Sequence, residues 1–301
     1  MASVPILALP PADLTSEVAP RRRRIHTLRV LGTQEAPRRK RCDTIMTEQQ
    51  TLRSLDRTVD ADEVAKFAAM AEEWWDPNGK FRPLHKFNPV RLTYLRDCIA
   101  DHYQRDPQAD APFTDLTIAD IGCGGGLLTE PMARLGATVT GIDATERNVE
   151  IARSHAQHMQ LPINYRFTTA ADLAETGARF DVVLTMEVIE HVTDPAVFIA
   201  DCARLVRPGG LMFLATLNRT AKAYLFAIAG AEYVLGWLPK GTHDWRRFVK
   251  PSEMAAALRD AGMRLDELSG VVYDPLKDSW RLKQRDLGVN YIALAHKADA
   301  A

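Results

Sequence analysis

A run of glycines that follows an apolar strand constrains the fold of this chain more than any other feature. Residues 117–121 have the composition of a buried strand and lead directly into the glycine loop, Gly122-Cys123-Gly124-Gly125-Gly126. Glycine lets a backbone turn tightly and approach a ligand closely. A loop for dinucleotides would need a third glycine at 127, where this chain has leucine. The alternative is that these glycines only pack a helix against the strand.

An acid at the end of the next strand favours the ligand-binding interpretation. Asp143 closes the segment 138–142, 21 residues after Gly122. A carboxylate at this place can accept hydrogen bonds from both hydroxyls of a ribose. Loop, spacing and acid together predict a nucleoside-type ligand at this edge of the sheet.

The rest of the chain alternates between strands and helices. The segments expected as strands are 117–121, 138–142, 163–168, 181–186, 211–217, 265–272 and 289–295. Helical stretches separate most of the first five, as in a parallel sheet with helices on both faces. The last two are expected to form an antiparallel edge, which gives an α/β fold with a seven-stranded, mostly parallel sheet.

The N-terminal third divides into a basic tail and a helical segment. Residues 1–45 contain nine Lys/Arg and four Asp/Glu, and prolines interrupt any helical period. We expect 1–57 to be a disordered tail; a targeting segment and a start codon upstream of the true one are alternatives. Residues 58–112 are expected to form lid helices, one over 58–76 and one that begins near Pro89. The domain proper is expected to span 58–301.

Composition excludes a wholly disordered chain, a collagen, a coiled coil and a polytopic membrane protein. The 301 residues are 46% hydrophobic and 26% charged, with a formal net charge of −1. This balance is typical of a soluble globular protein and provides no bulk attraction to nucleic acid. The four cysteines are far apart in the sequence, which argues against a disulfide framework or a zinc site.

The motifs DIGCGGG, GID and LVRPGG resemble those of class I S-adenosylmethionine-dependent methyltransferases. A narrower resemblance, to the ubiquinone-biosynthesis O-methyltransferases, rests on FAAMAEEWWD, PLHKFNPVRL, MEVIEHV, TLNR, GAEY and PKGTHD. It covers the chain from about residue 59 onward. It implies a Rossmann-like fold and S-adenosyl-L-methionine as methyl donor. The implied cofactor-binding residues are Arg91, Gly122, Gly124, Asp143 and Met186.

The segment Met186-Glu187-Val188-Ile189-Glu190-His191 is the candidate for catalysis. On a helical turn, residues spaced i, i+3 and i+4 share one face, so Glu187, Glu190 and His191 would converge. The resemblance supports a divalent metal at these three residues, and Mg²⁺ suits two carboxylates if substrate oxygens complete the shell. His191 and Glu190 are the expected catalytic residues. The alternative without metal is a solvated acidic helix start in which His191 is a general base or a structural donor.

An apolar insert over 219–249 is expected after the fifth strand. Its apolar core, 224–238, is too short to span a bilayer and is flanked by basic residues. Such a segment suits contact with a membrane surface, whereas a lid packed on its own core is the alternative.

The resemblance implies O-methylation of polyprenyl catechol, hydroxyphenol and 3-demethylubiquinol intermediates. We expect a cytoplasmic enzyme, peripheral on the inner membrane, or on its matrix side in a mitochondrion. Other quinone-biosynthesis enzymes are expected partners, and nucleic acid is not. Three alternatives remain: a metal-dependent RNA 2′-O-methyltransferase, a non-catalytic membrane-bound subunit of a quinone-biosynthesis complex, and a methyltransferase for small phenols.

Overall fold

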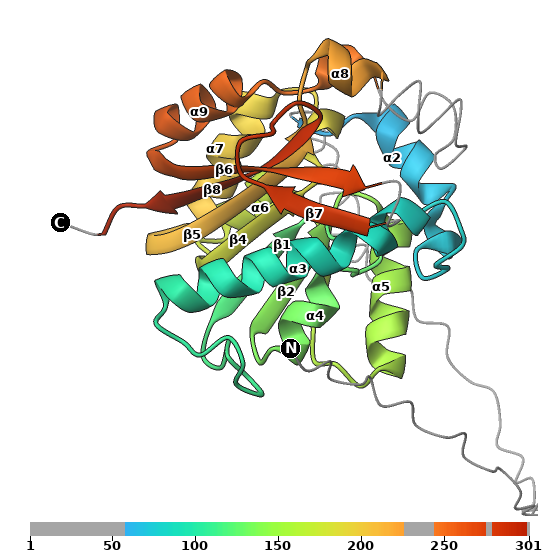
Figure 1. Cartoon of the computed structure of the whole chain (residues 1–301). Coiled ribbons are helices and arrows are strands. Elements are labelled where there is room, and N and C mark those ends of the chain that lie inside the picture. The colour runs from blue at the N-terminus through green and yellow to red at the C-terminus, as the bar shows by residue number, and fades with distance from the viewer. Residues whose placement is uncertain (1–57, 226–243, 275–278, 300–301) are drawn as a thin grey trace, which may run out of the picture. The chain divides into compact units, whose positions relative to one another are not determined.

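The computed structural model describes residues 58–225, 244–274 and 279–299 (Figure 1). The predicted tail, 1–57, lies outside the described residues. So does the apolar insert apart from its two ends.

A single eight-stranded sheet organises the described chain (Figure 1). Its order is β3-β2-β1-β4-β5-β8-β6-β7, with β3 to β5 parallel and the last three strands antiparallel to their neighbours. The strands are β1 (Thr117–Ile121), β2 (Thr138–Asp143), β3 (Asn164–Phe167), β4 (Phe180–Met186), β5 (Val206–Leu217), β6 (Met263–Asp274), β7 (Ser279–Lys283) and β8 (Asn290–Lys297).

The predicted fold class is confirmed, but the prediction of seven strands is wrong. The additional strand, β7, forms an antiparallel hairpin with β6 at the edge of the sheet. Its sequence, SWRLK, offers only two apolar side chains, which is too short an alternation to identify from sequence.

Helices cover both faces of the sheet (Figure 1). They are α2 (Ala61–Ala68), α3 (Arg82–His102), α4 (Thr129–Arg134), α5 (Glu146–His158), α6 (Ala170–Glu175), α7 (Pro195–Leu205), α8 (Ala221–Ala223) and α9 (Pro251–Asp260). Short 3-10 turns are η1 (Ala71–Glu73), η2 (Ile189–His191) and η4 (Trp245–Arg247). Among the described helices, none has the length and apolar character that crossing a bilayer requires.

Both N-terminal helices differ from the prediction. The helix expected over 58–76 ends at Ala68, and the chain then turns so that Met70 and Trp74 pack with Phe81 and Leu127. Tertiary packing here outweighs helix propensity. The second helix, α3, begins at Arg82 because Pro83 occupies its first turn, and Pro89 lies inside it.

The period-two pattern of the strands builds a core on each face of the sheet. On β5, Met212 and Leu214 join the core formed with α6, α7 and α9. Leu211, Phe213 and Ala215 join the opposite core, formed with α3 and α4. These two cores fix the carboxyl ends of the parallel strands, where open α/β sheets bind their ligands.

Candidate active site

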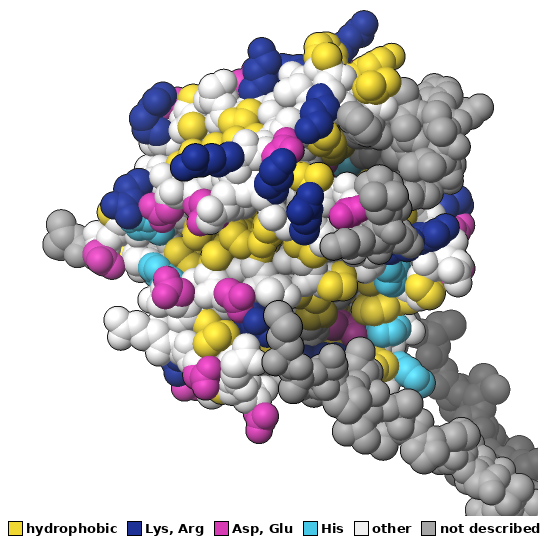
Figure 2. Space-filling model, viewed as in Figure 1, with side chains coloured by type: hydrophobic (Ala, Val, Ile, Leu, Met, Phe, Trp, Pro, Cys, Tyr) yellow, Lys and Arg dark blue, Asp and Glu magenta, His cyan; other side chains and the backbone are white. Residues whose placement is uncertain are grey.

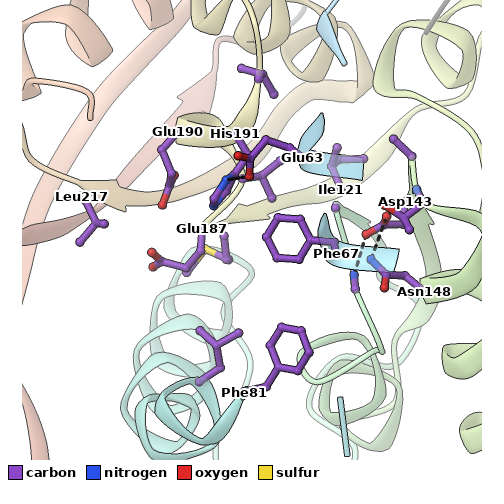
Figure 3. Close-up of a pocket in the computed structure, with 18 of the residues that line it drawn as sticks. Glu63, Phe67, Phe81, Ile121, Asp143, Asn148, Glu187, Glu190, His191 and Leu217 are labelled. Carbon is purple, nitrogen blue, oxygen red and sulfur yellow. Dashed lines mark hydrogen bonds and ion pairs between the residues drawn. The ribbon is translucent and has the colours of Figure 1, made fainter. Parts of the chain in front are cut away.

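A cavity of about 640 Å³ lies at the carboxyl ends of the parallel strands. That volume falls within the usual range for small-molecule sites. Residues of the N-terminal segment, the glycine loop, the ends of β2, β4 and β5, and the β6–β7 hairpin line it (Figure 3). The cavity therefore brings residues more than 200 positions apart in the sequence into one site.

The glycine loop turns at residues with left-handed backbone conformations. Gly122 has φ +72° and Gly124 has φ +53°. A Cβ added at Gly122 would lie 2.5 Å from Cγ2 of Val188. Both glycines line the cavity, so the expectation that they let the backbone approach a ligand is consistent with the structure.

Asp143 is buried at the end of β2, where backbone donors hold it in place (Figure 3). The amides of Gly124 and Thr145 donate to its two oxygens at 2.9 and 2.8 Å, and Nδ2 of Asn148 lies 3.3 Å from Oδ1. Burial raises the pKa of Asp143, and these hydrogen bonds oppose the rise. A carboxylate has about four acceptor positions, and these three donors leave one on Oδ2, so Asp143 can still accept from a ribose hydroxyl.

The N-terminal segment packs directly on the glycine loop. Nε1 of Trp74 donates to Oδ1 of Asn148 at 2.9 Å, and Nε1 of Trp75 donates to the Gly125 carbonyl at 2.9 Å. Trp74 lines the cavity together with Phe81, on which it stacks at 3.7 Å between ring centroids. Residues of this segment, between 58 and 87, thus form one wall of the cavity, and its role as a lid stays a prediction.

Replacing Gly124 by alanine tests this contact. A Cβ at Gly124 would lie 2.4 Å from the ring of Trp74. We expect the unfolding free energy to fall by about 1–3 kcal/mol more than in Gly177→Ala. Gly177 is a matched control, because its φ is also positive but no atom lies within 4 Å of an added Cβ. Urea unfolding of both variants measures the difference. Equal losses of unfolding free energy would mean that Trp74 is not in tight contact with the glycine loop.

Arg91 is the one predicted cofactor-binding residue that does not line the cavity. It is buried on α3, where its Nη2 donates to Oδ1 of Asn88 at 2.6 Å and its guanidinium lies 4.7 Å from the ring centroid of Phe87. Burial lowers the pKa of its guanidinium, and the negative charges of Glu187 and Asp120 oppose that fall. Within the described chain, its Nε has no acceptor. Its predicted contact with the carboxylate of the cofactor stays a prediction.

The acidic cluster after β4 takes a different shape from the predicted helical turn (Figure 3). Glu187 has φ +60°, a left-handed conformation, and only Ile189–His191 form a 3-10 turn. The three side chains therefore do not share one face of an α-helix. Among the described residues, no three His, Cys, Asp or Glu side chains are arranged to hold a metal ion.

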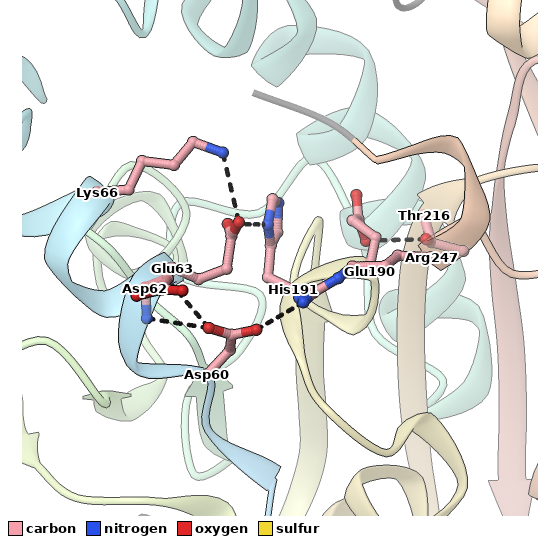
Figure 4. A network of polar contacts seen from close by, with 8 residues as sticks. All are labelled: Asp60, Asp62, Glu63, Lys66, Glu190, His191, Thr216 and Arg247. Carbon is pink, nitrogen blue, oxygen red and sulfur yellow. Dashed lines mark hydrogen bonds and ion pairs between the residues drawn. The ribbon is translucent and has the colours of Figure 1, made fainter. Parts of the chain in front are cut away.

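Glu190 and His191 instead have separate partners (Figure 4). Oε2 of Glu190 accepts from Oγ1 of Thr216 at 2.8 Å, and Nδ1 of His191 lies 2.7 Å from Oε2 of Glu63. Glu190 is buried, and this burial, together with the negative charge of Glu187, raises its pKa. All three predicted residues line the cavity, as does Met186.

Sequence reasoning missed Glu63, Asn148 and Thr216. Each lies beside a predicted residue, but Glu63 is 128 positions from His191 and Thr216 is 26 from Glu190. Only Asn148, five residues after Asp143 and one turn into α5, had a local spacing that could have indicated its role.

Comparison with known proteins identifies the family. A family model described as a methyltransferase domain matches residues 119–214. The ubiquinone biosynthesis O-methyltransferase of Parvibaculum lavamentivorans is 61% identical over 241 residues, which make up 80% of this chain and 95% of that protein. The chain belongs to the ubiquinone biosynthesis O-methyltransferase family. The member of this family from Chelativorans is 58% identical over 81% of this chain and 96% of its own length.

Solved structures agree on the fold. A possible histamine N-methyltransferase from Thermotoga maritima matches with a TM-score of 0.53 at 18% identity, over 78% of this chain and 99% of that one. Magnesium protoporphyrin IX methyltransferase from Synechocystis with bound SAH matches with a TM-score of 0.50 at 22% identity, over 73% and 86%. The predicted class, an S-adenosylmethionine-dependent O-methyltransferase, is confirmed. Names within the ubiquinone biosynthesis O-methyltransferase family support neither the RNA methyltransferase nor the non-catalytic subunit.

Proposed function

We propose that this protein transfers the methyl group of S-adenosyl-L-methionine to a ring hydroxyl of polyprenyl catechol, hydroxyphenol and 3-demethylubiquinol intermediates. The observation that carries the proposal is a single cavity that contains both the nucleoside-binding signature at Asp143 and the Glu187–Glu190–His191 cluster. The names of the relatives, all ubiquinone biosynthesis O-methyltransferases, support the substrate class.

Methyl transfer requires that the methyl donor and the phenolic oxygen are aligned and that the phenol loses one proton. As the methyl carbon bonds to the phenolic oxygen, its bond to sulfur breaks and the electron pair stays on sulfur as a thioether. Asp143 would hold the ribose, and Gly122, Gly124 and Met186 would pack on the donor, so that the methyl faces the substrate. Holding two reactants in such a geometry removes several kcal/mol of the barrier.

His191 is the proposed acceptor of the phenolic proton. Its Nδ1 faces the carboxylate of Glu63, which favours the tautomer that carries the proton on Nδ1. The lone pair is then on Nε2, the nitrogen that would act as base. A positioned base of this kind contributes about 10²–10⁴-fold to the rate.

Glu187 and Glu190 are the proposed ligands of a divalent cation, and His191 would be a third ligand only in place of its role as base, because both roles use Nε2. The donor set fits in part: the buried Glu190 interacts with the half-buried Glu187, and Oε1 of Glu190 has no hydrogen-bond donor among the described residues. A histidine that ligates a metal commonly donates its other nitrogen to a carboxylate, as His191 is placed to do to Glu63. When bound, the cation would lower the pKa of the phenol and orient its oxygens.

Removal of metal tests that part of the proposal. We expect EDTA to abolish methyl transfer to a catechol and Mg²⁺ to restore it, while binding of S-adenosylmethionine stays the same. Binding is measured separately by calorimetry, which controls for loss of the fold. Transfer that is indifferent to EDTA would contradict the metal and leave His191 as base.

We further propose that the protein lies on the cytoplasmic surface of the inner membrane, or on the matrix side in a mitochondrion, through residues 224–238. Residues 226–238 lie outside the described residues. The side chains of Tyr224 and Leu225, which begin the segment, are 53% and 58% exposed. Three of the described cations beside the segment are already paired: Arg219 with Glu253, Lys222 with Asp286, and Arg247 with Asp60. Apolar insertion would therefore carry more of the binding than charge does.

Sedimentation with lipid vesicles tests the membrane proposal. We expect binding to vesicles with and without anionic lipid, and its loss when Tyr224 and Leu225 are replaced by serine. Transfer to a catechol without a tail serves as the control and should be unaffected. Binding that requires anionic lipid and survives both substitutions would contradict the proposed mode.

A further inference from the structure

Three aromatic side chains form a wall of the cavity far from Asp143. They are Phe87 of α3, Tyr273 of β6 and Trp280 of β7, which we call the aromatic wall. The ring of Trp280 lies between the other two, with its centroid 5.2 Å from that of Phe87 and 5.2 Å from that of Tyr273. Trp280 is half-buried and packs on the core beneath α3.

The strand order places the aromatic wall at a definite distance from the reacting groups. Glu187 follows β4, and the order from there is β5, β8, β6 and β7. Neighbouring strands lie about 4.8 Å apart, so β6 and β7, which carry Tyr273 and Trp280, lie roughly 14–19 Å from β4 across the sheet. Asp143 ends β2, on the opposite side of β4. The aromatic wall and the nucleoside end thus flank the acidic cluster.

The lining between the cluster and the wall is apolar. Val271 and Val272 of β6, Leu217 of β5 and Val289 before β8 contribute to it. Three polar side chains there already have partners: Oδ1 of Asn290 accepts from the Val271 amide, and Lys222 pairs with Asp286. Figure 2 shows hydrophobic side chains gathered on the surface between α3 and the β6–β7 hairpin. This end of the cavity suits a hydrocarbon chain, since such a chain requires no hydrogen bonds.

We propose that the aromatic wall binds the first isoprene units of the substrate tail and so makes the enzyme selective for prenylated over tail-less catechols. The inference rests on the proposed function and adds a place for the tail. A phenol ring held at Glu187, Glu190 and His191 would direct its tail along Leu217 and Val271 toward Trp280. Aromatic and branched side chains offer large apolar area at little entropic cost. The β6–β7 hairpin thereby acquires a role in specificity.

The experiment compares kcat/KM for a farnesylated catechol and for the same catechol without a tail, both in detergent. We expect Trp280→Ala to lower the ratio of the two values about 10- to 100-fold, because Trp280 loses its contact with the tail. Transfer to the tail-less catechol should stay within about twofold. Trp280→Phe should keep most of the selectivity.

Leu282→Ala is the matched control. Leu282 lies two residues after Trp280 on β7, is half-buried and packs on the same core, but does not line the cavity. It should lose comparable packing and leave the ratio unchanged. If Trp280→Ala does not fold, Tyr273→Ser takes its place with the same expectation. A fall of both substrates together, or an equal effect of Leu282→Ala, would overturn the proposal.

Calorimetric binding of the farnesylated catechol separates this inference from the proposed function. If the unsubstituted protein binds the catechol but transfers no methyl group, the proposed function fails. The proposal that the aromatic wall binds the tail still holds in that case if Trp280→Ala weakens binding of the farnesylated catechol and Leu282→Ala does not. If Trp280→Ala binds the farnesylated catechol as tightly as the unsubstituted protein does, the proposal of tail binding is contradicted, even if methyl transfer succeeds.

Discussion

Replacing Asp143 by alanine will weaken the binding of S-adenosylmethionine about 100-fold or more. A hydrogen bond between a ribose hydroxyl and a carboxylate contributes about 1.5–3 kcal/mol, and Asp143 keeps one acceptor position for it beside those that Gly124, Thr145 and Asn148 use. The substitution also removes the acceptor for the amides of Gly124 and Thr145, which shape the loop. Isothermal titration calorimetry measures the loss.

Asp143→Asn provides the control for the shape of the loop. Its amide oxygen can still accept from one of the two backbone amides, but its nitrogen can only donate. We expect an intermediate affinity and a smaller change in the melting temperature. Wild-type affinity in Asp143→Ala would show that the ribose binds elsewhere and would remove Asp143 from the site.

The second large effect is expected at Glu190. Glu190→Gln should lower kcat about 10²–10⁴-fold while the affinity for S-adenosylmethionine stays within about twofold, because the residue acts on the substrate oxygen and not on the nucleoside. Rapid-quench transfer and calorimetry measure the two quantities. Undiminished turnover would remove Glu190 from both the metal and the base mechanisms.

The same substitution should increase stability. Burial and the charge of Glu187 raise the pKa of Glu190 in the folded protein. A carboxyl whose folded pKa lies above its unfolded value destabilises the fold as pH rises past the unfolded pKa. Glu190→Gln removes that cost at neutral pH, so its melting temperature in EDTA, without a bound cation, should rise.

Glu130→Gln is the matched control for both measurements. Glu130 is as deeply buried as Glu190, but it lies outside the cavity and pairs with His155 at 2.6 Å. It should lose stability and keep its turnover. A stabilised Glu130→Gln would contradict the argument that interaction with a neighbouring carboxylate distinguishes Glu190.

Local patterns in the sequence were sufficient to predict the parallel sheet, the glycine loop and Asp143. Strands β4 and β5 contain continuous apolar runs, strand β1 leads directly into Gly122, and strand β2 ends at Asp143. These features depend on periodicity and turn chemistry, both of which act over a few residues.

The remaining features depend on contacts between distant segments. The pairing of Glu63 with His191 joins α2 to η2, and the packing of Trp74 on the glycine loop ends the first helix early. The left-handed Glu187, which prevents the predicted helical face, has no signature in a non-glycine residue. No spacing rule could have shown these three features.

Transfer of an isotopically labelled methyl group to a farnesylated catechol tests the central claim most directly. The account predicts one labelled methyl group on a ring oxygen, located by NMR, for each molecule of S-adenosylhomocysteine formed. Binding of S-adenosylmethionine without any transfer to the ring oxygen, or a label found on carbon or nitrogen, would contradict it.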